Sequence, residues 1–251
     1  MRVLSIDFDY FVNPTPLQRV RYFPDGGREM SGLLNTFVWA GAYAHSKIAT
    51  KKFGDEKNSL MNVELLKKPL KAIHDIIVAQ KDVRCMVADS HAHAYDFIRE
   101  KWDGSTVELY NVDFHHDTYN AEEGVNCGNW LRLLMEEGIV DEAYWVNQPD
   151  SELEDNLTKV IPFSELPKTG YDLVYLCRSG WWTPPHMDEE FIKQLARPLI
   201  ENKNGWEVRY QQGILETRYN EELKALVRQE SAFRERIQNG DAFSHESRVP
   251  S

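Results

Sequence analysis

Three short apolar segments of this chain lead directly into aspartate and histidine, and this pattern constrains the fold more than any other feature of the sequence. The segments are residues 3–8, 83–88 and 107–112, and their β-branched composition predicts buried strands. The polar runs at their ends are SIDFD at 5–9, DSHAH at 89–93 and DFHHD at 113–117. Stretches with helical spacing separate the segments, which predicts a parallel sheet. In such a sheet, ligands bind beyond the carboxyl ends of the strands.

The rest of the chain continues this alternation. Two more strands are expected at 143–146 and 173–177. The helical pattern covers residues 30–50, 60–80, 92–101, 129–137, 187–201 and 217–238. Prolines and glycines predict a long loop over 13–28, and Pro69 marks a break or a second helix start within 60–80. We therefore expect one domain over 1–251 with a three-layer α/β/α fold, a mostly parallel central sheet and a polar tail at about 240–251.

Charge and cysteine content exclude several classes of protein. The chain carries 40 acidic and 29 basic residues, a formal net charge of −11. This balance disfavours a protein that follows nucleic-acid phosphates, because such a protein needs a basic surface. The longest apolar stretches, such as residues 37–44, are too short to cross a bilayer, and the N-terminus does not read as a signal peptide. Cys85, Cys127 and Cys177 form no CxxC pair, so we expect a cytoplasmic protein with reduced thiols. From the charge and the short apolar stretches we expect no nucleic-acid or membrane partner.

The run DFHHD is the strongest metal-binding signal in the sequence. In an extended chain, Asp113, His115 and Asp117 point to one side and His116 points elsewhere. Clustered carboxylates and imidazoles lose hydration and repel one another unless a cation neutralises them. Because such a run directly behind an apolar strand has few structural explanations, we expect a metal site here.

The other two polar runs are weaker signals. Asp7 and Asp9 alternate in the same way, but a DxD pair can also be a turn, a helix cap or the start of a phosphatase-type loop. Histidines such as His91 and His93, close to a helix start, are often caps or packed core residues. Taken alone, neither run establishes a metal site.

The three polar runs together resemble the motifs of a known family. The run NVDFHHD at 111–117 looks like the DxHxD motif of the ureohydrolases (arginases and agmatinases), which the histone-deacetylase superfamily shares in part. Residues 87–91 (VADSH) are similar to that family's Gly-Gly-Asp-His-Ser motif, and residues 5–11 (SIDFDYF) to its Ser-x-Asp-x-Asp-x-x-Asp-Pro motif. The resemblance implies a two-manganese site with six ligands, which are Asp7, Asp9, His91, Asp113, His115 and Asp117.

The chain also departs from the arginase pattern. Its DxD motif is N-terminal, whereas arginases place this motif after DxHxD, so the order of motifs is permuted. Leu131 stands about where arginases have a histidine proton shuttle, and His93 is an alternative to His91 as ligand. A short, rearranged chain of this kind looks most like the peptide arginases of ribosomal-peptide maturation. These enzymes convert arginine residues of a precursor peptide into ornithine and release urea.

The resemblance and the neighbouring residues suggest roles beyond metal binding. By analogy with the family, Asp117 would also hold and pass on a proton, and Asn129 lies in a segment, NCGN at 126–129, that is similar to the family's substrate pocket. His116 and His186 are candidate proton shuttles. Trp181 and Glu189 are candidate substrate-binding residues in the recognition-rich segment 178–190, although TPP followed by acidic residues is also an ordinary helix start.

Three other functions compete with the arginase hypothesis. A haloacid-dehalogenase-type, Mg²⁺-dependent phosphatase would use Asp7 as nucleophile and Asp9 as acid/base, but leaves DFHHD unexplained. A deacetylase-like amidohydrolase would need Asp113, His115 and one later aspartate around a single zinc ion, whereas Asp117 and the separate DxD favour two metals. A non-catalytic, metal-stabilised peptide-binding module is the third. The acidic net charge favours a cationic guanidinium or basic peptide over a phosphate ester as substrate.

Overall fold

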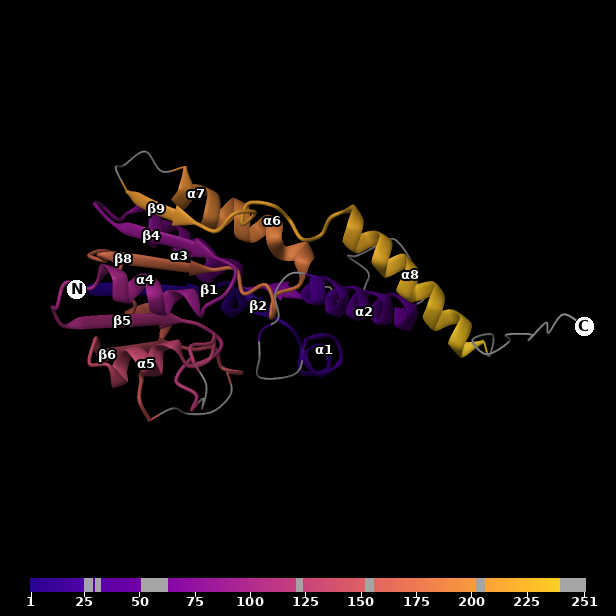
Figure 1. The fold of residues 1–251 in the computed structure, drawn as a ribbon, viewed down its shortest axis with the longest axis horizontal. Helices are drawn as coiled ribbons and strands as arrows, with labels where there is room; N and C mark the ends of the chain where they lie inside the picture. The colour runs from indigo at the N-terminus through magenta and orange to yellow at the C-terminus, as the bar shows by residue number, and fades with distance from the viewer. Residues whose placement is uncertain are drawn as a thin grey trace, which may run out of the picture.

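The computed structural model describes residues 1–24, 29, 33–50, 63–120, 124–151, 156–201 and 206–239. Its central sheet has seven strands joined by parallel pairs (Figure 1). The strands are β1 (Arg2–Asp7), β4 (Arg84–Ala88), β5 (Val107–Val112), β6 (Val140–Val146), β7 (Lys159–Val160), β8 (Leu173–Cys177) and β9 (Glu207–Tyr210). Their order across the sheet is β7-β6-β5-β1-β8-β4-β9. A separate antiparallel pair joins β2 (Val12–Asn13) to β3 (Glu64–Leu65).

Helices cover both faces of the sheet, as expected for a three-layer α/β/α fold. The helices are α1 (Pro16–Tyr22), α2 (Leu33–Thr50), α3 (Lys67–Val78), α4 (His93–Lys101), α5 (Trp130–Glu136), α6 (Asp188–Phe191), α7 (Arg197–Ile200) and α8 (Glu221–Gln238). One hydrophobic core joins the sheet to α3, α6 and α7, and a second joins its other face to α4 and α5. None of the helices in the described residues has the length and apolar character needed to cross a lipid bilayer.

The strands read as continuous apolar runs because both of their faces are buried. On β1, Leu4 and Ile6 belong to the core beneath α3, whereas Val3 belongs to the core beneath α4 and α5. Successive strand residues point to opposite faces, so a strand between two helical layers needs apolar side chains at nearly every position. This burial explains why 107–112 and 173–177 were predictable to the residue.

The N-terminal strand β1 occupies the centre of the sheet. It pairs in parallel with β5 on one side, with Ile6 opposite Val112, and with β8 on the other, with Asp7 opposite Cys177. The carboxyl end of the first strand therefore lies beside the carboxyl end of the strand that precedes DFHHD. A permuted motif order is compatible with one site because parallel strands can be added to a sheet from either end of a chain.

The predicted loop over 13–28 is wrong in part, because α1 occupies residues 16–22. Thr15 caps this helix by accepting a hydrogen bond from the backbone N–H of Gln18, and the Gln18 side chain accepts one from the Thr15 backbone. Pro16 is the first helical residue, a position that tolerates proline, so it starts the helix instead of breaking it. The predicted tail at 240–251 and residues 60–62 lie outside the described residues.

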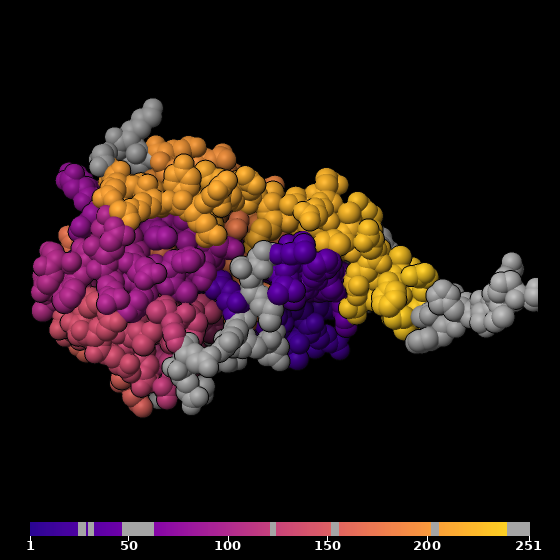
Figure 2. Space-filling view, in the orientation of Figure 1, coloured from indigo at the N-terminus to yellow at the C-terminus, as the bar shows by residue number. Residues whose placement is uncertain are grey.

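The helices α2 and α8 pack against each other and extend from one end of the α/β body (Figures 1 and 2). Trp39 and Tyr43 of α2 share a small core with Leu223 and Val227 of α8. Figure 1 shows the sheet strands running from the side of the N-terminus toward α1 and α2. The carboxyl ends of the strands, where the polar runs are found, therefore face these helices.

Candidate metal centre

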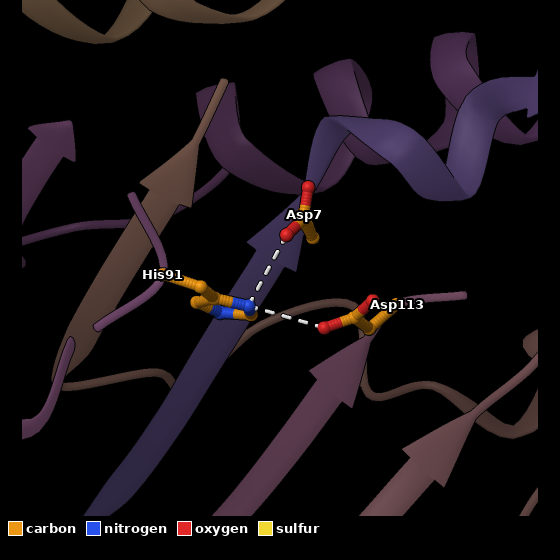
Figure 3. Close-up of side chains that lie close together, drawn as sticks. All are labelled: Asp7, His91 and Asp113. Atoms are coloured by element: carbon orange, nitrogen blue, oxygen red, sulfur yellow. Dashed lines mark ion pairs between the residues drawn. The ribbon is translucent and has the colours of Figure 1, made fainter. Parts of the chain in front are cut away.

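The ends of three strands bring Asp7, His91 and Asp113 together. Asp7 is the last residue of β1, His91 lies in the turn between β4 and α4, and Asp113 follows β5. The Nδ1 atom of His91 is 3.3 Å from Asp7 Oδ2 and 3.1 Å from Asp113 Oδ2 (Figure 3). It also lies 2.9 Å from Oδ2 of Asp117, in the loop after β5. All four side chains are buried.

A second group of ligand-type residues lies beside the first and shares Asp113 with it. The Nδ1 atom of His115 is 3.1 Å from Asp9 Oδ2 and 3.7 Å from Asp113 Oδ1. Asp113 therefore presents Oδ2 to His91 and Oδ1 to His115. In each of the triads Asp7–His91–Asp113 and Asp9–Asp113–His115, one donor atom per residue lies within 4.8 Å of the others. Each group could hold a metal ion, and the two groups share one carboxylate.

Turns, and not extended backbone, make these side chains converge. The expectation that alternation along a strand aligns them is wrong, because β1 ends at Asp7 and Asp9 lies in a 3₁₀ turn over Phe8–Phe11. The backbone N–H of Asp9 donates to Asp7 Oδ1 across 3.1 Å, which fixes the first carboxylate. Asp117 has a φ of 57°, in the left-handed region that aspartate tolerates better than most residues.

His91 gives the clearest evidence that this site fits a cation. Its Nε2 atom lies 2.6 Å from the Ser5 hydroxyl, a contact that fixes the ring. Its Nδ1 atom makes no hydrogen bond, although three carboxylate oxygens lie within 3.3 Å of it. If Nε2–H donates to Ser5, the lone pair of Nδ1 faces those carboxylates. Only a proton or a metal ion can relieve this arrangement, because it places electron-rich atoms together in a buried space.

The pKa values of the cluster follow from burial and from mutual charge. Burial raises the pKa of Asp7 to about 7, with neighbouring aspartates adding to the rise, and holds the pKa of Asp117 well above its usual range. Burial lowers the pKa of His91 and His115, but the adjacent carboxylates outweigh it and keep both well above their ordinary value. Burial also acts to raise the pKa of Asp113, yet the two histidines hold it below its usual range. Metal ions must displace the protons that these groups retain.

Aromatic and amide side chains hold the ligand residues in place. Trp130 donates its Nε1–H to Asp117 Oδ2 across 2.6 Å, and its ring centroid lies 4.8 Å from that of His91. The ring of Tyr175 also stacks on that of His91, with the ring centroids 5.6 Å apart and an interplanar angle of 11°. Asn111 Nδ2 donates to Asp113 Oδ2 across 3.3 Å. Such partners fix the orientation of metal ligands before the metal binds.

The structure places His91 in the cluster, whereas His93 is exposed at the first residue of α4. His116 is buried beside Thr118, with its Nδ1 2.7 Å from Thr118 Oγ1, and its ring contacts that of Trp145 at 5.7 Å. His186 contacts Tyr43 of α2, and its backbone N–H donates to the Tyr43 hydroxyl. Both predicted proton shuttles therefore pack against aromatic neighbours.

The predicted substrate-binding residues also differ in their environments. Asn129 is buried, and its amide accepts from the backbone N–H of Asn126 at 2.7 Å and donates to the carbonyl of Gly124 at 2.9 Å. Trp181 is buried, with its Nε1 unpartnered within the described part of the chain. Its neighbour Trp182 is the one that reaches the site, with its ring centroid 5.6 Å from that of His115. Glu189 is exposed on α6.

Sequence reasoning missed Glu29, a carboxylate close to the cluster. It accepts a hydrogen bond from the hydroxyl of Ser90, the residue before His91. Burial raises the pKa of Glu29 to about 7; the hydrogen bond from Ser90 opposes this rise, while the charges of Asp89 and Asp7 add to it. Within the described residues, Ser90 is its sole hydrogen-bond or ion-pair partner. No sequence signal marks Glu29, because it sits in a Gly- and Pro-containing stretch far along the chain from its neighbours.

The donor set of four aspartates and two histidines is chemically hard. Oxygen-rich sites of this kind suit Mn²⁺ better than a thiolate-rich zinc site would, although other divalent ions also bind such ligands. Comparison with known proteins finds no matching family model, no matching curated protein and no matching solved structure.

Proposed function

We propose that this protein is a hydrolase with two manganese ions that cleaves guanidinium groups. The observation that carries the proposal is the pair of Asp–His triads, buried except for the half-buried His115, that share Asp113 at the carboxyl ends of β1, β4 and β5. It is the ligand arrangement that the resemblance to arginases implies, assembled from a permuted order of motifs. His91, Asp7, Asp113 and Asp117 would hold one ion, and Asp9, Asp113 and His115 the other.

The reaction adds water to the guanidinium carbon and breaks its bond to the side-chain nitrogen, which gives urea and an amine. When bound, two divalent ions lower the pKa of water at the centre toward neutrality and so provide a nucleophile at neutral pH. By analogy with arginases, Asp117 would accept a proton from the nucleophilic water and pass it to the leaving amine. Trp130 keeps Asp117 oriented for this transfer through its 2.6 Å hydrogen bond.

Glu29 is the residue best suited to bind the guanidinium itself. A guanidinium is planar and cationic, so a carboxylate that accepts two parallel hydrogen bonds is its natural partner. Glu29 is half-buried next to Ser90, and it forms no ion pair with a lysine or arginine among the described residues. It replaces Glu189 as our candidate, since Glu189 is exposed on α6.

The substrate we propose is an arginine residue within a precursor peptide, converted to ornithine during ribosomal-peptide maturation. The side-chain amide of Asn129 is hydrogen-bonded to the backbone of its own loop through one N–H and its oxygen. The formal charge of −11 favours a basic peptide, and the unpaired Cys85, Cys127 and Cys177 support a cytoplasmic location.

Substitution of Glu29 tests the guanidinium-binding role. Glu29→Gln keeps the size of the side chain and removes its charge, so we expect KM for an arginine-containing peptide to rise about 10–100-fold, the value of one to two charge-assisted hydrogen bonds. Glu190→Gln, at an exposed position on α6, is the matched control and leaves KM unchanged. Steady-state urea release measures both. A larger rise for Glu189→Gln than for Glu29→Gln would restore the assignment that the sequence suggested.

The proposed reaction is tested by incubating Mn²⁺-loaded protein with arginine-containing peptides and with free arginine. We expect urea in solution and loss of one CH₂N₂ unit from the peptide mass, with the peptide consumed in preference to the free amino acid. Phosphatase activity that is lost in Asp7→Asn and retained in His115→Ala would contradict the proposal and support the haloacid-dehalogenase alternative. Metal binding without urea from any arginine compound would support a binding module instead.

A further inference from the structure

A loop over residues 178–188 connects β8 to α6 and carries an aromatic side chain to the metal centre. Trp182 in this loop is partly exposed, and its ring centroid lies 5.6 Å from that of the candidate ligand His115. At this distance, the Trp182 ring would contact a substrate bound next to His115. Aromatic faces attract cations, so the position of Trp182 bears directly on the binding of a guanidinium.

One end of the loop is fixed to the turn that carries His91. Arg178 donates its Nε–H to Asp89 Oδ1 across 2.7 Å, and Asp89 lies two residues before His91. The backbone N–H of Gly180 donates to the Asp89 carbonyl across 3.2 Å. A Cβ atom at Gly180 would collide with the Asp89 carboxylate, so a larger residue here would push that carboxylate out of its present place. The loop after β8 and the loop after β4 therefore stay paired beyond the end of the sheet.

The rest of the loop is fixed by Arg218, which lies just before α8. Its backbone N–H and its Nε–H donate to Asp188 Oδ2 at 2.7 and 2.9 Å. Its guanidinium also donates to the carbonyls of Gly180 and Thr183, the latter at 3.1 Å. Trp39 of α2 donates its Nε1–H to the same Gly180 carbonyl across 3.2 Å. This partly buried guanidinium thus holds the loop at Gly180 and Thr183 and the start of α6 at Asp188.

We propose that Arg218 is a positioning residue that sets the place of Trp182 beside the metal centre and thereby the affinity for the cationic substrate. Buried ion pairs contribute little net stability compared with apolar side chains of the same volume, but a planar guanidinium fork fixes the geometry of the groups it binds. Arg218 acts through the loop, since within the described part of the chain it donates to Asp188, Gly180 and Thr183 and not to a ligand residue. The effect on substrate affinity rests on the proposed function.

The test compares Arg218→Lys, which keeps the charge and loses the fork, with Arg209→Lys as control. Arg209 is exposed and pairs with Glu100 on the surface. For Arg218→Lys we expect KM for the arginine peptide to rise about 10–100-fold, with Mn²⁺ affinity unchanged. Amide hydrogen exchange of residues 179–187 accelerates, while exchange of β4 and β5 stays at the wild-type rate. The control variant matches wild type in all four measurements.

Trp39→Phe provides a milder variant in case Arg218→Lys does not fold. It removes the hydrogen bond to the Gly180 carbonyl and part of a buried ring while keeping Arg218, and it is expected to change KM and loop exchange in the same direction by a smaller factor. Wild-type KM and wild-type loop exchange in the folded variants would overturn the proposal, as would a lower melting temperature with KM unchanged. If the wild-type protein releases no urea, the proposed function fails. The positioning role then stands or falls on the exchange rates, which need no turnover.

Discussion

Asp113→Asn is expected to remove both metal ions and with them the hydrolytic activity. Asp113 is the one residue common to the two triads, and its two oxygens face His91 and His115 separately. Asparagine keeps the shape of the side chain but lacks its negative charge and one of its oxygens. Loss of a single preorganised group that stabilises charge typically costs ~10²–10³ in rate, and this change disables two metal sites. We therefore expect urea release to fall by about 10³-fold or more.

The measurement is the number of Mn²⁺ ions retained per chain after gel filtration, together with the rate of urea release. Asp75→Asn is the matched control, because Asp75 is an exposed residue of α3 that pairs with Lys71 on the same helix. The control is expected to retain both ions and full activity. Retention of two ions and wild-type turnover by Asp113→Asn would show that Asp113 is not a shared ligand.

Addition of Mn²⁺ is expected to stabilise the protein strongly, and more so as the pH rises. A ligand at about 1,000 times its dissociation constant stabilises the native state by about 4 kcal/mol. For a protein of this size, each kcal/mol shifts the melting temperature by roughly 2–4 °C, so the expected increase is roughly 8–16 °C. The increase arises because the ions replace protons and neutralise carboxylates that burial has stripped of water.

The direction of the pH dependence follows from the pKa shifts. The pKa of Asp7 is raised to about 7, and those of His91, His115 and Asp117 are raised as well. A raised pKa contributes stability that is present at low pH and is lost as the pH rises through the folded-state value. The metal-free protein should therefore melt at lower temperature at pH 8 than at pH 6. The lowered pKa of Asp113 acts in the opposite direction, but only in strong acid.

Thermal melts at pH 6 and pH 8, with chelator and with Mn²⁺, measure this effect. We expect the gap between the chelated and the loaded protein to widen at pH 8. Asp113→Asn is the control, and Mn²⁺ should not change its melting temperature. A gap that narrows with rising pH, or an equal response in Asp113→Asn, would contradict a site built from these residues.

The central strands of the sheet could be predicted from the sequence because burial on both faces leaves a continuous apolar run within each strand. The strands at 107–112 and 173–177 are buried on both faces, so their apolar runs have the length of the strand itself. The sequence does not predict helix α1, because a proline such as Pro16 is typical of loops, whereas here it is the first residue of a capped helix. β9 was also not predicted, since its burial is slight and its sequence, EVRY, lacks a continuous apolar run.

The candidate ligands were predictable from residue type, but their geometry was not. DFHHD and DxD contain the required carboxylates and imidazoles, yet the side chains converge through a 3₁₀ turn and through the left-handed Asp117. The choice between His91 and His93 depends on the turn before α4, which sequence spacing does not determine. Glu29 and Arg218 could not be identified in advance, because each acts through contacts with residues distant in the chain.

We expect Asp7, Asp9, His91, Asp113, His115 and Asp117, all buried except the half-buried His115, to bind two adjacent metal ions. This expectation is tested most directly by titrating metal-free protein with Mn²⁺ and recording both the stoichiometry and the electron paramagnetic resonance spectrum. We predict two ions per chain, with a spectrum of magnetically coupled Mn²⁺ once the second site fills, because Asp113 places both ions on one carboxylate. A single uncoupled ion per chain, or no bound ion, would contradict the two-metal centre and the guanidinium hydrolysis proposed from it.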